Sequence, residues 1–195
     1  MSAAILIVLA TITAVVAARQ EGDAPPQTRA AWARLIAYWL FTIVVAFEMA
    51  AAALWGLLNI EYVRVVLTHL GYPLYFHYII AAPRIPCALA LLAPRFPRLK
   101  EWAYAGAFFL YAGAAASHLL SGDRAEQSVV GPFFSSFTFA AFTLASWAPR
   151  TPSRRLGQSP PATAPSAVAW SVPVLITVGM LTVAFITLPQ AAPPR

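Results

Sequence analysis

Residues 70–123 read LGYPLYFHYIIAAPRIPCALALLAPRFPRLKEWAYAGAFFLYAGAAASHLLSGD, and this stretch decides the fold. It holds two apolar segments, 72–93 and 101–120, joined by the short basic turn PRFPRLK. A helix needs roughly 20 apolar residues to cross about 30 Å of hydrocarbon, so each segment is long enough to span a membrane. Because the turn is short, we expect the two helices to be antiparallel neighbours.

The composition of the whole chain agrees with a membrane protein. Hydrophobic residues make up 60% of the sequence and charged residues only 10%, and the apolar residues occur in long runs. Four further runs have the length of a membrane span or nearly so: 2–18, 35–58, 131–148 and 167–188. The first is the shortest and also resembles a signal peptide. It has no basic residue before its apolar core, which favours an uncleaved anchor.

The net charge of +6 is explained by membrane topology. Three basic residues lie in the second connection, the fourth connection and the tail, and Arg84 lies inside a span. The other nine lie in the first, third and fifth connections: Arg19, Arg29, Arg34, Arg95, Arg98, Lys100, Arg150, Arg154 and Arg155. The positive-inside rule therefore predicts that these connections are cytoplasmic and that both termini lie outside. Nucleic-acid binding is not needed to explain the charge.

Cysteine and histidine usage argues against several other site types. Cys87 is the single cysteine, so neither an internal disulfide nor a dithiol motif can form. His69, His77 and His118 have no close ligand spacing, and we predict no metal site. The sequence also shows no haem ligand pair and no flavin motif, so the chain has no evident electron carrier of its own.

An acid, a base and a phenol are predicted to lie at one depth in the membrane. Glu48, Arg84 and Tyr111 each fall close to the centre of a predicted span. A buried charge is costly unless it is neutralised, paired or placed against a polar cavity. We therefore expect the three residues to form one cavity cluster, with Glu48 paired to Arg84. Pro83 and Pro86 are expected to kink the helix on either side of Arg84.

A second group of polar residues lies toward the opposite end of the same helices. Asn59, His77, His118 and Asp123 are expected to line an outer mouth of the cavity. His118 also continues a stripe of period seven with Tyr104 and Tyr111, and an alternative interpretation is that these three are packing residues with locally satisfied polar atoms.

Four strings of the sequence resemble a known family of small bacterial membrane proteins. They are LGYPLYF at 70–76, PRFPRLKEWAYAGAFF at 94–109, SHLLSGD at 117–123 and SWAPRTPSRRL at 146–156. Their order and spacing are similar to the DoxX-like family, over about 32–156. Relatives commonly carry a Gly and a Lys near the middle of the second helix, whereas this chain has AAPRIP at 81–86 and keeps a base only as Arg84.

The resemblance implies an all-α membrane protein with a four-helix transmembrane bundle core. To this core the sequence adds one N-terminal and one C-terminal transmembrane helix. The expected divisions are an anchor at 1–18, a cytoplasmic linker at 19–31, the bundle at 32–156, a flexible linker at 157–166 and the last helix at 167–188. The resemblance also implies the bacterial cytoplasmic membrane.

Two functional interpretations stay open at this point. The family resemblance implies a subunit or accessory of a quinone-linked membrane redox system, with oxidoreductase subunits as partners and a cavity for a quinone or another lipophile. Alternatively, the chain is a non-catalytic scaffold or assembly factor whose buried charges only specify helix packing. The sequence identifies no catalytic residue, and a transporter is disfavoured because the chain has no internal repeat.

Overall fold

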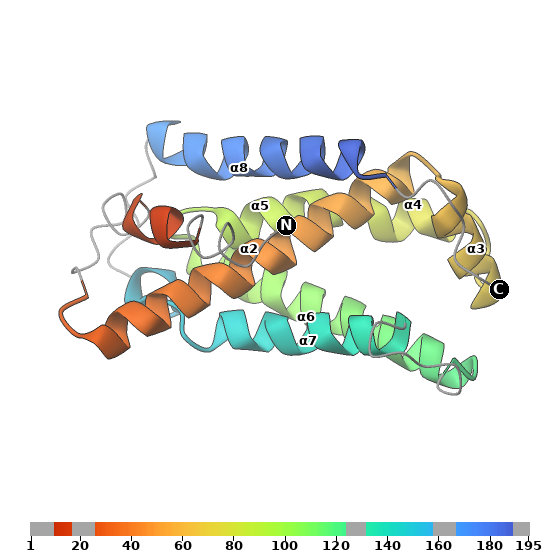
Figure 1. The fold of residues 1–195 in the computed structure, drawn as a ribbon, viewed down its shortest axis with the longest axis horizontal. Coiled ribbons are helices and arrows are strands. Elements are labelled where there is room, and N and C mark those ends of the chain that lie inside the picture. Colours follow the sequence, from red (N-terminus) through yellow and green to blue (C-terminus); the bar gives the residue numbers. More distant parts are fainter. Residues whose placement is uncertain (1–9, 17–25, 124–131, 158–166, 189–195) are drawn as a thin grey trace.

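The chain is helical throughout the parts that the structure describes, as the sequence predicts (Figure 1). The structure, a computed structural model, describes residues 10–16, 26–123, 132–157 and 167–188. These residues contain no β-strand. The expected linker at 158–166 and the outer connection at 124–131 lie outside the described residues.

The helices follow one another with short connections. They are α2 (Arg29–Leu57), α3 (Glu61–His69), α4 (Phe76–Ala81), α5 (Arg84–Leu92), α6 (Pro97–Leu120), α7 (Pro132–Trp147), the 3-10 turn η1 (Pro152–Arg154) and α8 (Ala167–Ile186). Among the described segments, α2, α6 and Ala169–Ile186 of α8 are long and apolar enough to cross a membrane. Helix α7 and the pair formed by α4 and α5 are also apolar but shorter.

Helix α2 lies at the centre of the molecule (Figure 1). It contacts α4, α5, α7 and α8, and α6 joins α5 to α7 on the other side. Small side chains make these close contacts possible, as is usual between membrane helices. Gly56 is the tightest point, since a Cβ there would lie 2.7 Å from the Cβ of Ala81 in α4. A larger residue at Gly56 would push α4 away from α2.

The second membrane segment is divided into two helices, in agreement with the expected kink. Helix α4 ends at Ala81 and α5 begins at Arg84. Neither Pro83 nor Pro86 can donate a backbone hydrogen bond to the carbonyl four residues earlier. The break therefore lies at the middle of the segment, beside Arg84.

The outer connection before this segment is more ordered than the sequence suggested. The sequence indicated only a connection between two spans, and Glu61–His69 within it forms α3. Its apolar residues recur at helical spacing, and Leu67 is buried among neighbouring residues while Glu61 and Arg64 form an exposed ion pair. This helix is too short to cross a membrane.

The turn between α5 and α6 is also tighter than expected, because α6 begins at Pro97 and not at Glu101. The extra helical turn carries Lys100 inward, where its side chain is completely buried. Its ammonium group donates hydrogen bonds to the carbonyls of Ala90 (3.0 Å) and Leu91 (2.8 Å), at the end of α5. Lys100 thus caps carbonyls that have no helical donor.

Only part of the predicted N-terminal anchor is described. Residues 10–16 are helical, and Ala10 and Ala14 are fully buried in the hydrophobic core. The rest of the expected anchor lies outside the described residues. At the other end of the chain, Trp55 of α2 donates its indole N–H to the carbonyl of Ala184 (3.1 Å), which joins α8 to the core.

Asp123 links the C-terminal ends of α3 and α6. Its carboxylate accepts hydrogen bonds from His69 at the end of α3 and from His118 in the last turn of α6, both at 2.5 Å. Burial of the carboxylate acts to raise the pKa of Asp123, but the hydrogen bonds and charges of the two histidines outweigh it and lower that pKa below its usual value of 3.8. Asp123 therefore fastens α3 to the bundle in its ionised form.

We predict that Lys100→Met lowers the thermal stability of the protein in detergent. The carbonyl of Ala90 loses its donor, and that of Leu91 keeps only the longer bond from Arg154 (3.4 Å). An unsatisfied buried polar group costs about 1–3 kcal/mol. The matched control is Arg98→Met, on the same turn of α6 but exposed. Melting curves of the two variants give the measurement, and equal melting temperatures would contradict the capping role.

We predict that Asp123→Asn destabilises the protein by about 1 kcal/mol, a small value because His69 is 54% exposed and partly screened by water. A lowered pKa stabilises the fold above pH 3.8, and this stabilisation is lost as the pH falls through the folded-state value. The difference in melting temperature between wild type and variant should be present at pH 6 and shrink below about pH 3.8. A difference in melting temperature that does not depend on pH would show that the ionised carboxylate of Asp123 does not stabilise the fold.

Candidate functional site

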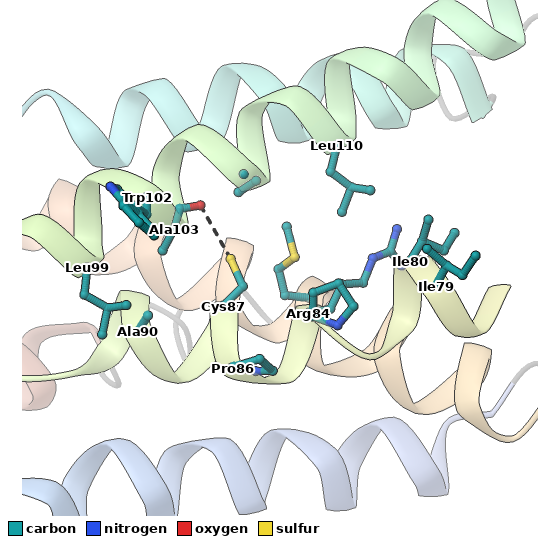
Figure 2. Close-up of a pocket in the computed structure, with 14 residues that line it drawn as sticks. Ile79, Ile80, Arg84, Pro86, Cys87, Ala90, Leu99, Trp102, Ala103 and Leu110 are labelled. Carbon is teal, nitrogen blue, oxygen red and sulfur yellow. Dashed lines mark hydrogen bonds between the residues drawn. The ribbon is translucent and has the colours of Figure 1, made fainter. Parts of the chain in front are cut away.

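The main cavity is a groove between the α4–α5 pair and α6, with a volume of about 480 Å³ (Figure 2). Its walls are almost entirely apolar. They are formed by Met49, Ile79, Ile80, Pro83, Arg84, Pro86, Cys87, Ala90, Leu99, Trp102, Ala103, Gly106, Ala107 and Leu110. Ile79, Leu99 and Trp102 are exposed, Trp102 to 81%, so the groove opens on the side of the helical bundle. In a membrane this side faces lipid.

Small residues of α6 create the space. Ala103, Gly106 and Ala107 form the floor where α6 passes α5, and a Cβ built at Gly106 meets no atom within 4 Å. The thiol of Cys87 in α5 donates to the carbonyl of Ala103 in α6 (3.5 Å) and so links the two helices that border the groove (Figure 2). The helix break at Pro83 forms the opposite part of the wall.

Arg84 is the only charged side chain among the residues that line this groove. It occupies the first position of α5, directly after the proline break. Its Nε is buried and has no hydrogen-bond partner among the described residues. A guanidinium group remains protonated in proteins, so it cannot avoid the cost of burial by losing its charge. The groove therefore presents a cation with an unused donor to whatever occupies it.

Glu48 and Tyr111 meet behind the groove. The phenol of Tyr111 donates a hydrogen bond to the carboxylate of Glu48, and the ring of Tyr111 stacks on Phe139 with centroids 5.4 Å apart. Glu48 directly precedes Met49, which forms part of the groove wall. The hydrogen-bonded carboxylate and phenol therefore lie beside the groove without being part of its lining.

The expected direct pair between Glu48 and Arg84 is not formed: among the described residues neither side chain takes part in an ion pair. The reason is the helix break. Arg84 begins a new helix whose first turn places its side chain along the groove, whereas Glu48 bonds to Tyr111 of α6. The charges of Glu48 and Arg84 nevertheless both act on the side chains of Tyr111 and Cys87. A single cluster of Glu48, Arg84 and Tyr111 therefore stays a prediction.

The four residues expected at an outer mouth separate into two places. His118 and Asp123 are bonded to each other, together with His69, which the sequence interpretation left out of the site. His77 lies in α4, donates from Nδ1 to the carbonyl of Leu74, and keeps a buried Nε2 without a partner among the described residues. Asn59 lies in the turn after α2 with a positive φ of 51°, and it likewise has a buried side-chain oxygen without such a partner.

Tyr104, Tyr111 and His118, which recur at intervals of seven along α6, form polar contacts inside the protein. All three of its members are buried, and each bonds to another part of the chain. The pairs are Tyr104 with Ser146 at 2.8 Å, Tyr111 with Glu48, and His118 with Asp123 at 2.5 Å. Ser146 also bonds to Thr42 of α2 at 2.7 Å. The stripe therefore connects α6 to its neighbours along its whole length.

Sequence reasoning missed a group of basic side chains at the other end of the bundle. Lys100, Arg150 and Arg154 were assigned to connections predicted to be cytoplasmic, with no role in the core, but all three are buried. Arg154 donates to the phenol of Tyr38 (2.9 Å), and its guanidinium lies 4.5 Å from the centre of the Trp39 ring. The available signal was the aromatic pair at the start of α2, because Arg stacks on aromatic rings. No group of three metal-ligating side chains occurs within the described ranges.

Comparison with known proteins identifies the family. A sequence model of the DoxX-like family matches residues 40–146, from the first half of α2 to the end of α7. No curated protein and no solved structure matches the chain. The match covers more than half of the sequence and includes the groove, Glu48, Arg84 and Tyr111. This chain is therefore a membrane protein that belongs to the DoxX-like family.

Proposed function

We propose that the protein binds a membrane-soluble lipophile with a hydrogen-bond acceptor in the groove between α5 and α6, and that this ligand is a quinone. The observation that carries the proposal is the buried Nε of Arg84, which has no partner among the described residues and lies in an otherwise apolar cavity. A ligand oxygen at this position would satisfy the donor, and an apolar ring would fill the space around it.

A quinone meets both requirements of the groove. Its carbonyl oxygen accepts a hydrogen bond from a guanidinium, and its ring is flat enough to lie against Trp102 and Leu110. Its isoprenoid tail leaves through the open side of the groove into the lipid. The site has few polar atoms, which suits a ligand that arrives from the bilayer and not from water.

Glu48 is the acid that could serve this ligand. Reduction of a quinone to a quinol takes up two electrons and two protons, and the electrons would come from a partner oxidoreductase subunit. Glu48 adjoins the groove wall at Met49 and shares a hydrogen bond with Tyr111, which holds it ready to exchange one of the protons. We therefore propose that the chain is a subunit or accessory of a membrane redox system.

The same proposal includes the arrangement in the membrane. The contacts of α2, α5, α6 and α7 form a closed ring, which supports a four-helix core, and α8 packs outside it against α2 and α5. The buried and exposed basic residues gather where α2, α6 and α8 begin and α7 ends (Figure 1). We place this basic end in the cytoplasm of a bacterial cell, by the positive-inside rule.

One specific observation favours the alternative of a non-catalytic scaffold. Glu48 and Tyr111 satisfy each other, and Lys100 donates to the carbonyls at the end of α5. Buried polar contacts of this kind can specify which helices pack together, without any chemistry. On that alternative the groove holds only lipid chains, and Arg84 needs no particular ligand.

We predict that Gly106→Leu reduces quinone binding by about tenfold, because the new side chain fills the groove without meeting the backbone. The matched control is Gly113→Leu, two turns further along α6, where a Cβ also meets no atom within 4 Å but which lies outside the groove. Binding of decylubiquinone to the full chain in detergent, followed by native mass spectrometry, provides the measurement.

The two functional alternatives give different results in this experiment. A quinone proposal requires about one decylubiquinone per wild-type chain, with loss in Gly106→Leu and in Arg84→Leu and retention in Gly113→Leu. Equal binding to all four proteins, or none to the wild type, would contradict it. A co-purifying oxidoreductase with no bound quinone would support the scaffold.

We predict that Tyr111→Phe destabilises the protein by about 1–3 kcal/mol, since the carboxylate of Glu48 loses its donor. Replacing both partners, as in Glu48→Leu with Tyr111→Phe, should restore much of this stability, because no unsatisfied group is left. Thermal melting of the single variants and the double variant tests the coupling. Additive losses would show that the two side chains do not act as a pair.

A further inference from the structure

A second cavity lies at the basic end of the bundle, away from the groove. It has a volume of about 270 Å³ and is lined by Glu101, Trp147, Ala148, Arg150, Arg155 and Leu156. It lies where the C-terminal end of α7 meets the first turns of α6. Three of its six lining residues are charged, and two of them are arginines.

Several contacts hold the side chain of Arg150 in the wall of this cavity. Its Nε donates to the carbonyl of Trp147 and its Nη2 to the carboxylate of Glu101, both at 2.8 Å. The guanidinium lies 5.1 Å from the ring centres of both Tyr104 and Trp147. Only 5% of the residue is exposed. These contacts fix the plane of the guanidinium group and leave it no freedom to search for another partner.

One donor of Arg150 remains unused in this arrangement. Its Nη1 is buried and has no hydrogen-bond partner among the described residues. A buried donor on a charged group without an acceptor is costly, and such atoms in native structures call for an explanation. An acceptor in the adjoining cavity would supply it.

The charges around the cavity favour an anion as this acceptor. Glu101 is already engaged, since one of its oxygens accepts from Arg150 and the other from the indole of Trp147 (2.9 Å). Arg155 donates to the carbonyls of Ala148 (3.0 Å) and Arg150 (2.8 Å), where it caps the end of α7. Among the residues that line the cavity, two carry a guanidinium group and one carries a carboxylate.

The position of the cavity in the fold identifies the source of the anion. Exposed tryptophans mark the level of lipid headgroups in membrane proteins, and Trp102 and Trp147 are both exposed at this end, one on α6 and one in the cavity wall. The starts of α2, α6 and α8 lie at the same end (Figure 1), and Arg29 and Arg98 lie in the first turns of α2 and α6. Headgroup phosphates of the bilayer lie at this level.

We propose that this cavity is a phosphate-binding site that takes the headgroup of an anionic phospholipid. The planar fork of Arg150 matches the oxygens of a phosphate group, with Nη1 as the donor and Trp147 beside the headgroup. This site is separate from the groove and does not depend on the identity of the ligand there. It ties one anionic lipid to the junction of α6 and α7.

The test compares lipid retention by the full chain in detergent and in vesicles. Native mass spectrometry should find one phosphatidylglycerol per chain after mixing with that lipid, and no such adduct with phosphatidylcholine. Vesicles with phosphatidylglycerol should raise the melting temperature above that in phosphatidylcholine vesicles. Inorganic phosphate forms a separate arm: protection by millimolar phosphate as strong as that by the lipid would assign the site to a soluble phosphate compound and overturn the lipid headgroup.

Two variants test the residues of the site. Arg150→Gln should abolish the adduct, whereas Arg98→Gln, which removes an exposed basic residue at the same end, should leave it unchanged. Equal losses in both would show only general attraction between basic protein and acidic lipid, and would overturn a specific site.

Glu101→Gln keeps the proposal testable if Arg150→Gln does not fold. This variant removes the one negative charge among the described residues that line the cavity, and it should strengthen binding of phosphatidylglycerol by about fivefold. If Glu101 had only a structural role, Glu101→Gln would lower the melting temperature without strengthening lipid binding. Unchanged or weaker binding would overturn the proposal.

Discussion

The proline break between α4 and α5 is the constraint on which the rest of this structure depends. A membrane helix satisfies its backbone hydrogen bonds internally, and Pro83 and Pro86 remove two of these bonds in the middle of the segment. The segment continues as a second helix, and Arg84 occupies its first position. From that position follow the groove beside α6, the buried donor of Arg84 within it, and its separation from Glu48.

The buried polar side chains of the core are of two kinds: some form hydrogen-bonded pairs, and others keep a polar atom without a partner among the described residues. Tyr111 with Glu48, and Tyr104 with Ser146, form closed pairs between helices. Arg84 and Arg150 each retain a buried nitrogen without a partner in the described part of the chain, and each borders a cavity. Closed pairs explain packing, whereas an open donor beside a cavity supports the proposal that a ligand binds there. The proposals of a binding protein and of a scaffold differ in how they account for these two open donors.

Much of the fold follows from the sequence because its apolar runs and prolines act locally. The helical class, the family, the kinked second segment and the basic end could all be predicted. The sequence did not reveal which basic side chains are buried. A basic residue near a helix end reads as exposed, but one extra turn of α6 carries Lys100 inside, and the rings of Tyr38 and Trp39 cover Arg154. Depth in the membrane suggested that Glu48, Arg84 and Tyr111 lie near one another, and Glu48 does bond to Tyr111. Depth carries no information about the direction of a side chain after a helix break, so it could not show that Arg84 forms no direct ion pair with Glu48.

Because the groove opens on the side of the bundle, the occupancy of the groove depends on the composition of the membrane. Its mouth lies between exposed side chains of α4 and α6 that face lipid, and not at either end of the bundle. A molecule that enters there diffuses in two dimensions and competes with acyl chains of the bilayer. Its occupancy is then set by its mole fraction among the lipids, so the same protein would be filled in a quinone-rich membrane and empty in a quinone-poor one, at identical concentrations in the surrounding water.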